Sequence, residues 1–313
     1  MNLAVTKNCL ARLARVASLV GIVATHFVSS AQSLYIANAG FESNTITPGA
    51  FVVLQPQGWV TYDPSSIIDS SQNAVGVIRP LPGVEYFPEG APEGNNAAIV
   101  YLAGPQTAVV GLQQTLTNTL QPNTRYRLSA DAGNIASGTS LAGSSGGPGV
   151  FYDLDGFPGY RLDLLAGGTV VAVDSNSIGA TIPEGEFRRA TLIFDTSTTN
   201  VQLGQTLGVR VVNLKFPGTP SVPNIEVDFD DVRLLAGPIP MRASLEINLS
   251  GGSVGIGITG TTGAVYRVEC TSALPASNWV TLTNLTLPIS PFVITDTSVT
   301  NFENRFYRAV IVE

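Results

Sequence analysis

Short apolar runs separated by clusters of turn-forming residues recur along almost the whole chain, and this rhythm is the strongest constraint on its fold. The 313 residues include 32 glycines and 20 prolines, and only 12% are charged. Beyond the N-terminus, no window of about 11–18 residues shows the sustained apolar period of about 3.6 residues that an amphipathic helix requires. The sequence therefore predicts an all-β protein.

The longest series of such runs lies in residues 34–236, which we expect to form one large domain. Within it, Tyr126, Leu128 and Ala130 alternate with polar neighbours, as in a strand that is buried on one side. The number and spacing of the runs favour a jelly-roll β-sandwich of two sheets. A Gly/Ser-rich segment, residues 137–149, interrupts the rhythm and predicts a loop.

A second, smaller domain is expected after residue 236. Residues 237–241 contain two prolines and are interpreted as a linker. Residues 242–313 carry further short strand-like runs, which predict a small β-sandwich. Residues 266–269, 279–282 and 305–308 of this part resemble a small β module that is often appended to large secreted bacterial proteins. The resemblance implies a structural or attachment role. Cys270 is flanked by strand residues, so we expect it to be buried rather than reactive.

The first 31 residues are predicted to be a signal peptide. Three basic residues precede an apolar run over residues 16–28, and small side chains follow up to Ala31. The run is shorter than the roughly 20 residues of a membrane-spanning helix, and no later stretch is apolar for that long. We therefore expect a secreted or cell-surface protein with no transmembrane segment after signal removal.

The charge and the rare residues exclude several functions. The formal net charge is −7, and three of the 16 basic residues lie in the expected signal peptide, which disfavours nucleic acid as a partner. The only histidine, His26, and Cys9 also lie there, so the mature chain would keep only Cys270. Histidine-dependent catalysis, histidine-ligated zinc and an internal disulfide are then excluded. Acid–base chemistry is left to carboxylates and tyrosines.

An acidic segment near the end of the large domain is the main candidate site. Residues 227–234 contain Asp228, Asp230 and Asp231, and we expect them to form the last strand beside a first strand at residues 38–42. Side chains alternate along a strand, so Asp228 and Asp230 share one face and need a proton or a cation between them. Oxygen-rich clusters without histidine favour Ca²⁺. The alternative is a solvated strand end.

Aromatic residues in turn-rich stretches are candidate ligand-binding groups, because exposed aromatic faces stack on sugar or indole rings. The candidates are Trp59, Tyr62, Phe151 and Tyr152, with Tyr86 and Phe87 in a similar setting. Two alternatives stay open. A core position under a loop is favoured for Trp59, and the loop that precedes Phe151 is equally interpreted as a simple connection.

Residues 38–42 together with residues 229–232 resemble the opening and closing motifs of calcium-stabilised jelly-roll carbohydrate-binding modules. In that family the opening Glu and the closing Asp ligate a structural calcium. The resemblance implies Glu42 and Asp230 as side-chain ligands of Ca²⁺, with Asn38 as a further candidate.

A larger part of the domain, roughly residues 34–236, is similar to the Stig cyclases, the hapalindole and fischerindole cyclases. The matching segments are residues 94–102, 112–116, 122–134, 160–168 and 227–234. The resemblance implies a calcium-bound jelly roll, a homodimer, and the acid-initiated rearrangement and cyclisation of a prenylated indole-type substrate. It implies Asp228 as the acid, in an apolar pocket that raises its pKa, and Tyr101 as the tyrosine beside the substrate.

The loop after Asn134 departs from the cyclase pattern. Residues 135–149 are mostly small and contain no aromatic residue, so the aromatic side chain that packs on the substrate in that family is expected to be missing. We therefore predict a non-catalytic module that binds a small molecule or glycan, most simply a carbohydrate. A Stig-cyclase-like enzyme and a structural cell-surface protein are the alternatives.

Overall fold

The computed structural model describes residues 31–105, 107–250, 253–275, 278–298 and 304–312. In these segments the chain forms β-strands and one short 3-10 turn, η1 (Gly179–Thr181), and no α-helix, which confirms the predicted all-β fold. None of the described segments is a helix with the length and apolar character that a membrane crossing requires. The expected signal peptide lies outside the described residues, apart from Ala31.

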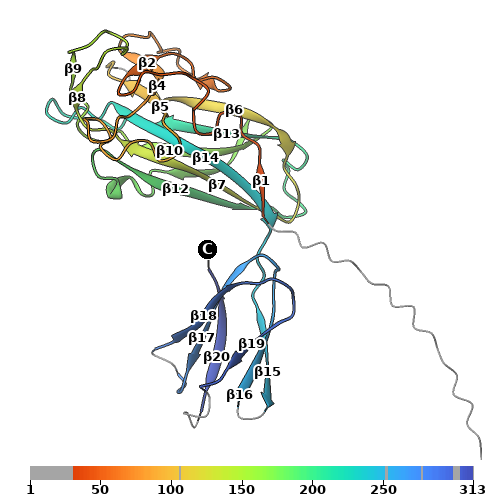
Figure 1. The fold of residues 1–313 in the computed structure, drawn as a ribbon. Helices are drawn as coiled ribbons and strands as arrows, with labels where there is room; N and C mark the ends of the chain where they lie inside the picture. The colour runs from red at the N-terminus through yellow and green to blue at the C-terminus, as the bar shows by residue number, and fades with distance from the viewer. Residues whose placement is uncertain (1–30, 106, 251–252, 276–277, 299–303, 313) are drawn as a thin grey trace, which may run out of the picture.

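Two antiparallel sheets build the jelly-roll β-sandwich (Figure 1). The first sheet has the strand order β12 (Glu186–Asp195), β7 (Thr124–Asn134), β14 (Glu226–Pro238), β5 (Ala97–Leu102), β4 (Asn73–Ile78) and β2 (Phe51–Val53), with β1 (Gln32–Leu34) paired to β14. The second sheet has the order β11 (Thr169–Ser175), β10 (Tyr160–Ala166), β13 (Thr206–Asn213), β6 (Val110–Thr119) and β3 (Val60–Tyr62). The main apolar core fills the space between the two sheets.

β14 is central in the first sheet, where it pairs with β7, β5 and β1. Val227 and Phe229 point inward and are fully buried. A bulge follows, in which Asp231 has a φ of +46° and the register with β7 shifts. Because the bulge adds one residue, Leu234 returns to the core and the strand continues to Pro238. The end of β14 thus reaches into residues 237–241, the segment expected to be a linker, where Pro238 still pairs with Thr124 of β7.

The segment 38–42, expected to be the opening strand, is a turn instead. Asn38 and Phe41 have positive φ values of 51° and 58°, and the Phe41 N–H donates to the Asn38 carbonyl (3.1 Å). A Cβ at Gly40 would lie 2.0 Å from Oε2 of Glu93, so a larger residue there would displace the Glu93 side chain. The turn does lie beside β14, as expected, because the Val232 N–H donates to the Ala39 carbonyl (3.1 Å).

An outer layer covers the other side of the first sheet near β5, β4 and β2. It consists of the loops around residues 79–96 and 135–157, the second of which includes β8 (Gly138–Thr139) and β9 (Phe151–Tyr152) (Figure 1). A second apolar cluster lies between this layer and the sheet: Ile78, Tyr86, Phe87, Ala97, Ile99, Ile135, Leu154 and Ile225. The outward-facing acids of β14 are therefore buried, and the alternative of a solvated strand end does not hold.

The C-terminal part forms two three-stranded sheets. One has the order β15 (Ser244–Ser250), β16 (Ser253–Thr259) and β19 (Phe292–Asp296), and the other β18 (Val280–Thr286), β17 (Val265–Thr271) and β20 (Phe306–Ile311). Residues from both sheets enclose a separate apolar core, and Cys270 is buried. The expected fold class, a jelly roll followed by a small β-sandwich, is confirmed.

The inward face of β14 gives a stability prediction. Phe229→Ala should lower the free energy of unfolding by about 3–5 kcal/mol, because it leaves a cavity at a fully buried position. Val173→Ala on β11, where the side chain is half-exposed, should change it by less than about 0.5 kcal/mol. Urea unfolding at equilibrium measures both. Equal effects of the two variants would contradict the assignment of Phe229 to the core.

Candidate functional site

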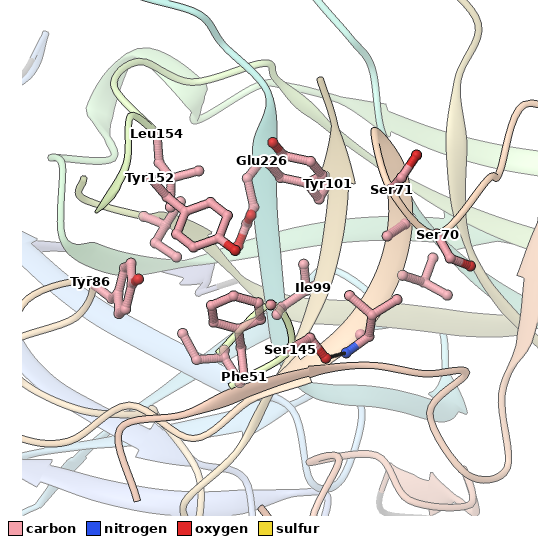
Figure 2. A pocket seen from close by; sticks show the side chains of 17 residues that line it. Phe51, Ser70, Ser71, Tyr86, Ile99, Tyr101, Ser145, Tyr152, Leu154 and Glu226 are labelled. Carbon is pink, nitrogen blue, oxygen red and sulfur yellow. Dashed lines mark hydrogen bonds between the residues drawn. The ribbon is translucent and has the colours of Figure 1, made fainter. Parts of the chain in front are cut away.

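A cavity of about 270 Å³ lies between the first sheet and the outer layer (Figure 2). Seventeen residues line it: Phe51, Val53, Ser70, Ser71, Ala74, Val75, Gly76, Ile78, Tyr86, Ile99, Tyr101, Ile135, Ser145, Gly146, Tyr152, Leu154 and Glu226. Most are apolar or aromatic, and the polar groups are hydroxyls and one carboxyl. This composition is typical of a pocket for a small, largely apolar ligand.

The loop after Asn134 forms one wall of the cavity because it is attached to β2, the edge strand of the first sheet. The Val53 N–H donates to the Ser145 hydroxyl (2.9 Å), and the Ser145 N–H donates to the Phe51 carbonyl (2.9 Å). The rings of Phe51 and Tyr152 then meet edge to face, with centroids 5.3 Å apart. The short side chains of the loop allow this close attachment, and Tyr152 brings an aromatic ring to the cavity from the far end of the loop.

Glu226 is the only carboxyl group among the lining residues. It stands at the start of β14, opposite Tyr101 of β5, and its side chain is 5% exposed. Burial raises the pKa of Glu226 from 4.5 to about 8, because the carboxylate form loses its hydration there. At neutral pH Glu226 is therefore mostly protonated and able to donate a proton into the cavity.

Asp228 lies two residues further along the same face of β14 but is not among the residues that line the cavity. It is fully buried, and neither of its carboxyl oxygens has a hydrogen-bond partner in the described part of the chain. Burial, and then the charge of Glu226, raise the pKa of Asp228 well above its ordinary value. The strand thus presents two neighbouring buried acids with raised pKa values, of which only Glu226 lines the cavity.

Three tyrosines contribute to the cavity, Tyr86, Tyr101 and Tyr152. Burial raises the pKa of Tyr86 and of Tyr101, and the charge of Glu226 acts in the same direction. Both phenols therefore remain protonated and serve as hydrogen-bond donors or acceptors. Figure 2 shows the Tyr152 and Tyr101 side chains on the same side of the cavity as Glu226.

The other predicted ligand-binding aromatics lie elsewhere. Trp59 is buried in the main core, stacked on Phe41 at 5.3 Å, with its indole N–H donated to the Asn38 carbonyl (3.0 Å). Tyr62 belongs to the second sheet, where the guanidinium of Arg210 lies 3.9 Å from its ring centre. Phe151 is exposed and does not line the cavity, because it alternates with Tyr152 along β9.

The three predicted calcium ligands lie around the turn at residues 38–42. Oε1 of Glu42 accepts hydrogen bonds from the N–H groups of Asn95 (2.7 Å) and Asn96 (2.6 Å). Oδ2 of Asp230 accepts one from the Glu93 N–H (2.8 Å). The structure thus brings Glu42 and Asp230 to the same segment, residues 93–96.

The Asn38 side chain makes two hydrogen bonds. Its Oδ1 accepts from the Ser43 N–H (2.9 Å), which closes the turn, and its Nδ2 donates to the carbonyl of Gln57, outside the turn (2.7 Å). Within the described residues, no group of three or more His, Cys, Asp or Glu side chains is arranged to hold a metal ion.

Sequence reasoning missed Glu226 and Phe51. Glu226 carried a usable signal, because it stands two residues before Asp228 and period-2 alternation places both on one face. Phe51 carried none, since its role depends on a loop that is distant in sequence. Tyr86 was one of several aromatics in turn-rich stretches, and nothing local distinguished it from Phe87.

Comparison with known proteins places this arrangement among cyclases. Residues 32–235 match a family model, HpiC1-like, described as HpiC1 cyclase. The structure of a cyclase from Fischerella sp. TAU is 40% identical, covers 67% of this chain and 98% of its own, and superposes with a TM-score of 0.56. No match was found among the curated proteins.

Two further solved structures contain indole compounds. A Stig cyclase, Fisc, from Fischerella sp. TAU in complex with (3Z)-3-(1-methyl-2-pyrrolidinylidene)-3H-indole is 40% identical, covers 67% of this chain and 99% of its own, and has a TM-score of 0.57. A cyclase from Fischerella sp. TAU in complex with 4-(1H-indol-3-yl)butan-2-one is 40% identical, covers 66% of this chain and 98% of its own, and has a TM-score of 0.56.

The buried Glu226 carboxyl predicts a pH-dependent stability difference. Because its folded-state pKa of about 8 lies above the ordinary 4.5, wild-type stability is complete below pH 4.5 and falls as the pH rises through 8. Glu226→Gln removes this loss. It should be about as stable as wild type at pH 4.5 and more stable at pH 8.5, by on the order of 1–5 kcal/mol.

Urea unfolding at the two pH values measures this difference. Glu246→Gln, at an exposed position of β15, is the matched control and should follow wild type at both. A Glu226→Gln curve parallel to wild type across this range would show that Glu226 keeps an ordinary pKa.

Proposed function

Because this chain belongs to the HpiC1-like cyclase family, we propose that it catalyses the acid-initiated rearrangement and cyclisation of a prenylated, indole-type substrate. The observation that carries the proposal is the neutral, buried carboxyl of Glu226 in an apolar cavity. An acid of this kind is what proton-initiated chemistry on an apolar molecule requires. The indole compounds held by the related cyclases support the substrate class.

The prediction of a non-catalytic carbohydrate-binding module is wrong. It rested on the missing aromatic residue after Asn134 and on the likeness of two short motifs to carbohydrate-binding modules. The family match over residues 32–235 and the 40% identity to cyclases overturn it. The structure also supplies Tyr152 to the cavity from the far end of the loop, so the small residues after Asn134 are no argument against an aromatic wall.

In the proposed mechanism Glu226 donates its proton to the bound substrate, which becomes a cation. The prenyl double bond then attacks the cationic centre, a carbon–carbon bond forms, and loss of a proton to the Glu226 carboxylate regenerates the acid. Substrate and product are isomers, so no co-reactant is consumed. The rings of Phe51, Tyr101 and Tyr152 stabilise the positive charge, and the apolar walls exclude water that would trap the cation.

Asp228, the acid implied by family resemblance, has a different place in this proposal. It lies two residues after Glu226 on the same face of β14, outside the cavity lining, and in its neutral form it would add no negative charge next to the catalytic acid. A single charge at Asp228 would favour proton retention by Glu226 and weaken it as a donor. We therefore propose Glu226 as the proton donor and Asp228 as a neighbour that keeps the site uncharged.

Turnover of a prenylated indole isonitrile by two isosteric variants tests this assignment. Glu226→Gln should lower kcat by about 100-fold or more, which is the usual contribution of a general acid. Asp228→Asn, which keeps a neutral side chain of the same shape, should stay within about tenfold of wild type. The opposite ranking would identify Asp228 as the acid.

The pH profile gives a second readout of the same variants. Wild-type kcat should be constant at neutral pH and fall above about pH 8, where Glu226 loses its proton. Asp228→Asn should keep the same falling limb. No product from wild type at any pH would contradict the cyclase proposal itself.

We further propose a structural Ca²⁺ between the turn at residues 38–42 and β14. Asp230 is fully buried, and burial, together with the charges of Asp131 and Glu93, raises its pKa to about 8. The carboxylates of Glu93 and Asp230 both approach Gly40, and the donors here are oxygen atoms, which Ca²⁺ prefers. Glu42 and Asp230 would be its side-chain ligands, and the ion would supply the positive charge that the buried Asp230 lacks.

Calcium removal tests this site. EDTA should lower the melting temperature of wild type by several degrees, because a ligand bound only to the folded state stabilises it. Asp230→Asn should melt at the same temperature with and without EDTA, whereas the Glu246→Gln control should respond like wild type. Circular dichroism follows the melt, and a wild-type curve that EDTA does not shift would exclude the site.

A further inference from the structure

Tyr86 has a buried hydroxyl without a hydrogen-bond partner in the described part of the chain. The residue is 4% exposed and lines the cavity. Leaving a buried hydroxyl unbonded costs about 1–3 kcal/mol, and folded proteins rarely tolerate it. Other buried tyrosines are bonded: Tyr126 accepts from the Gln121 N–H (2.7 Å), and Tyr160 donates to Asp174 (2.6 Å).

The backbone at Tyr86 is also strained. Its φ is +77°, a conformation that bulky residues rarely adopt and that costs on the order of 1–3 kcal/mol. The surrounding structure enforces it, because the Ala136 N–H donates to the Tyr86 carbonyl (3.1 Å) and the neighbouring Phe87 ring packs on Phe187 with centroids 4.2 Å apart. The ring is therefore held against the cavity although both the strained backbone and the unbonded hydroxyl lower the stability of the fold.

Gly138 makes room for this ring. A Cβ at Gly138 would lie 3.0 Å from Cε1 of Tyr86 and 2.8 Å from Cβ of Glu85. The loop after Asn134 thus fits closely over Tyr86 only because its residue at this point is glycine. The position of Tyr86 is the result of several independent contacts rather than of one flexible side chain.

Figure 2 shows where the hydroxyl stands relative to the acid. Tyr86 lies on one side of the cavity, Ser70 and Ser71 lie on the opposite side, and Glu226 lies between them. The surface near Tyr86 is apolar, formed by Phe51, Ile135 and Leu154 among others. A ligand with an apolar body and one polar group at its end fits this arrangement, with the polar group at Tyr86 and the body across Glu226.

The charge around Tyr86 determines which polar group fits. The ionisable groups near it are Glu226, Tyr152 and Glu85, all of them acids, and none of the described residues that line the cavity is basic. Such surroundings favour a hydrogen-bond donor on the ligand. The N–H of an indole is a donor only, and it projects from the edge of an otherwise apolar ring system.

We propose that Tyr86 is a specificity-determining residue whose hydroxyl accepts a hydrogen bond from the indole N–H of the substrate and so positions the ring over Glu226. This inference rests on the proposed function, since it names the group that orients the substrate in the same cavity. Substrate binding then supplies the hydrogen bond that the Tyr86 hydroxyl lacks within the protein. Tyr86 takes no part in proton transfer.

Calorimetric titration with two probes tests the proposal: 4-(1H-indol-3-yl)butan-2-one and its N-methyl counterpart, which has no N–H. Tyr86→Phe should weaken binding of the N–H probe by about tenfold, the effect of one buried hydrogen bond. It should change binding of the N-methyl probe by less than about twofold. Tyr126→Phe, outside the cavity, is the matched control and should bind both probes like wild type.

Thermal melting distinguishes a binding role from a structural one. Tyr86→Phe removes a hydroxyl that has no partner, so its melting temperature should equal or exceed that of wild type. Tyr126→Phe loses a bonded hydroxyl and should melt lower. A lower melting temperature for Tyr86→Phe would show that its hydroxyl is used within the protein, and would overturn the proposal.

The titrations also separate this inference from the function on which it rests. If wild type and Tyr86→Phe bind the N–H probe equally, Tyr86 is not the anchor and the cyclase proposal is unaffected. If Tyr86→Phe weakens both probes equally, the hydroxyl contacts a group other than the indole N–H, and the proposal is wrong. If wild type binds neither probe in the presence of calcium, the indole-type substrate class fails, and the inference fails with it.

Discussion

The burial of acids on the outward face of β14 is the constraint on which the rest of this structure depends. Val227 and Phe229 fix the strand in the core, and alternation then directs Glu226, Asp228 and Asp230 to the other side. An ordinary jelly roll would leave that side in water. Here the outer layer covers it, so the acids lose hydration and two of them, Glu226 and Asp230, have pKa values near 8. Burial of these acids lowers the stability of the fold at neutral pH, and it leaves Glu226 as a protonated carboxyl group in an apolar cavity.

The outer layer depends on small residues as much as on apolar ones. Ser144 and Ser145 bond the loop to the free edge of β2, which also protects that edge from other chains. Gly138 lets the loop pass over Tyr86, and Gly146 lies near the Tyr152 hydroxyl, where a Cβ would be 3.0 Å away. The Gly/Ser-rich composition that predicted a loop is therefore what allows the loop to form a close-fitting wall.

The sequence was sufficient for whatever follows from local pattern. Turn clusters and period-2 alternation predicted the all-β fold and placed Asp228 and Asp230 on one face. Residues 38–42 were predicted to be a strand because they resemble a motif that opens jelly rolls. They form a turn, and their Asn and Gly residues, which adopt positive φ readily, were the local sign of it. Contacts between segments far apart in the chain determine three further features: the core position of Trp59, the place of Tyr152 in the cavity and the unbonded hydroxyl of Tyr86. No local pattern encodes such contacts, and Glu226 alone was within reach of strand alternation.

The four acids of β14 all lose hydration on burial, and the structure offsets this loss in different ways along the strand. At Asp231 burial alone would raise the pKa, but hydrogen bonds from Arg233 and Arg189 lower it. The bulge makes this possible, because its positive φ turns Asp231 toward the two arginines. Asp230, one residue earlier, has backbone N–H donors from Glu93 and Asp231 instead. Glu226 and Asp228 have no arginine among the causes of their pKa shifts, so a proton is what neutralises them. From Asp231 toward the cavity, the negative charge of each acid is thus offset in a different way: by arginines at Asp231, by backbone N–H groups at Asp230, and by a bound proton at Glu226. Of these three, only the bound proton can be transferred to a ligand.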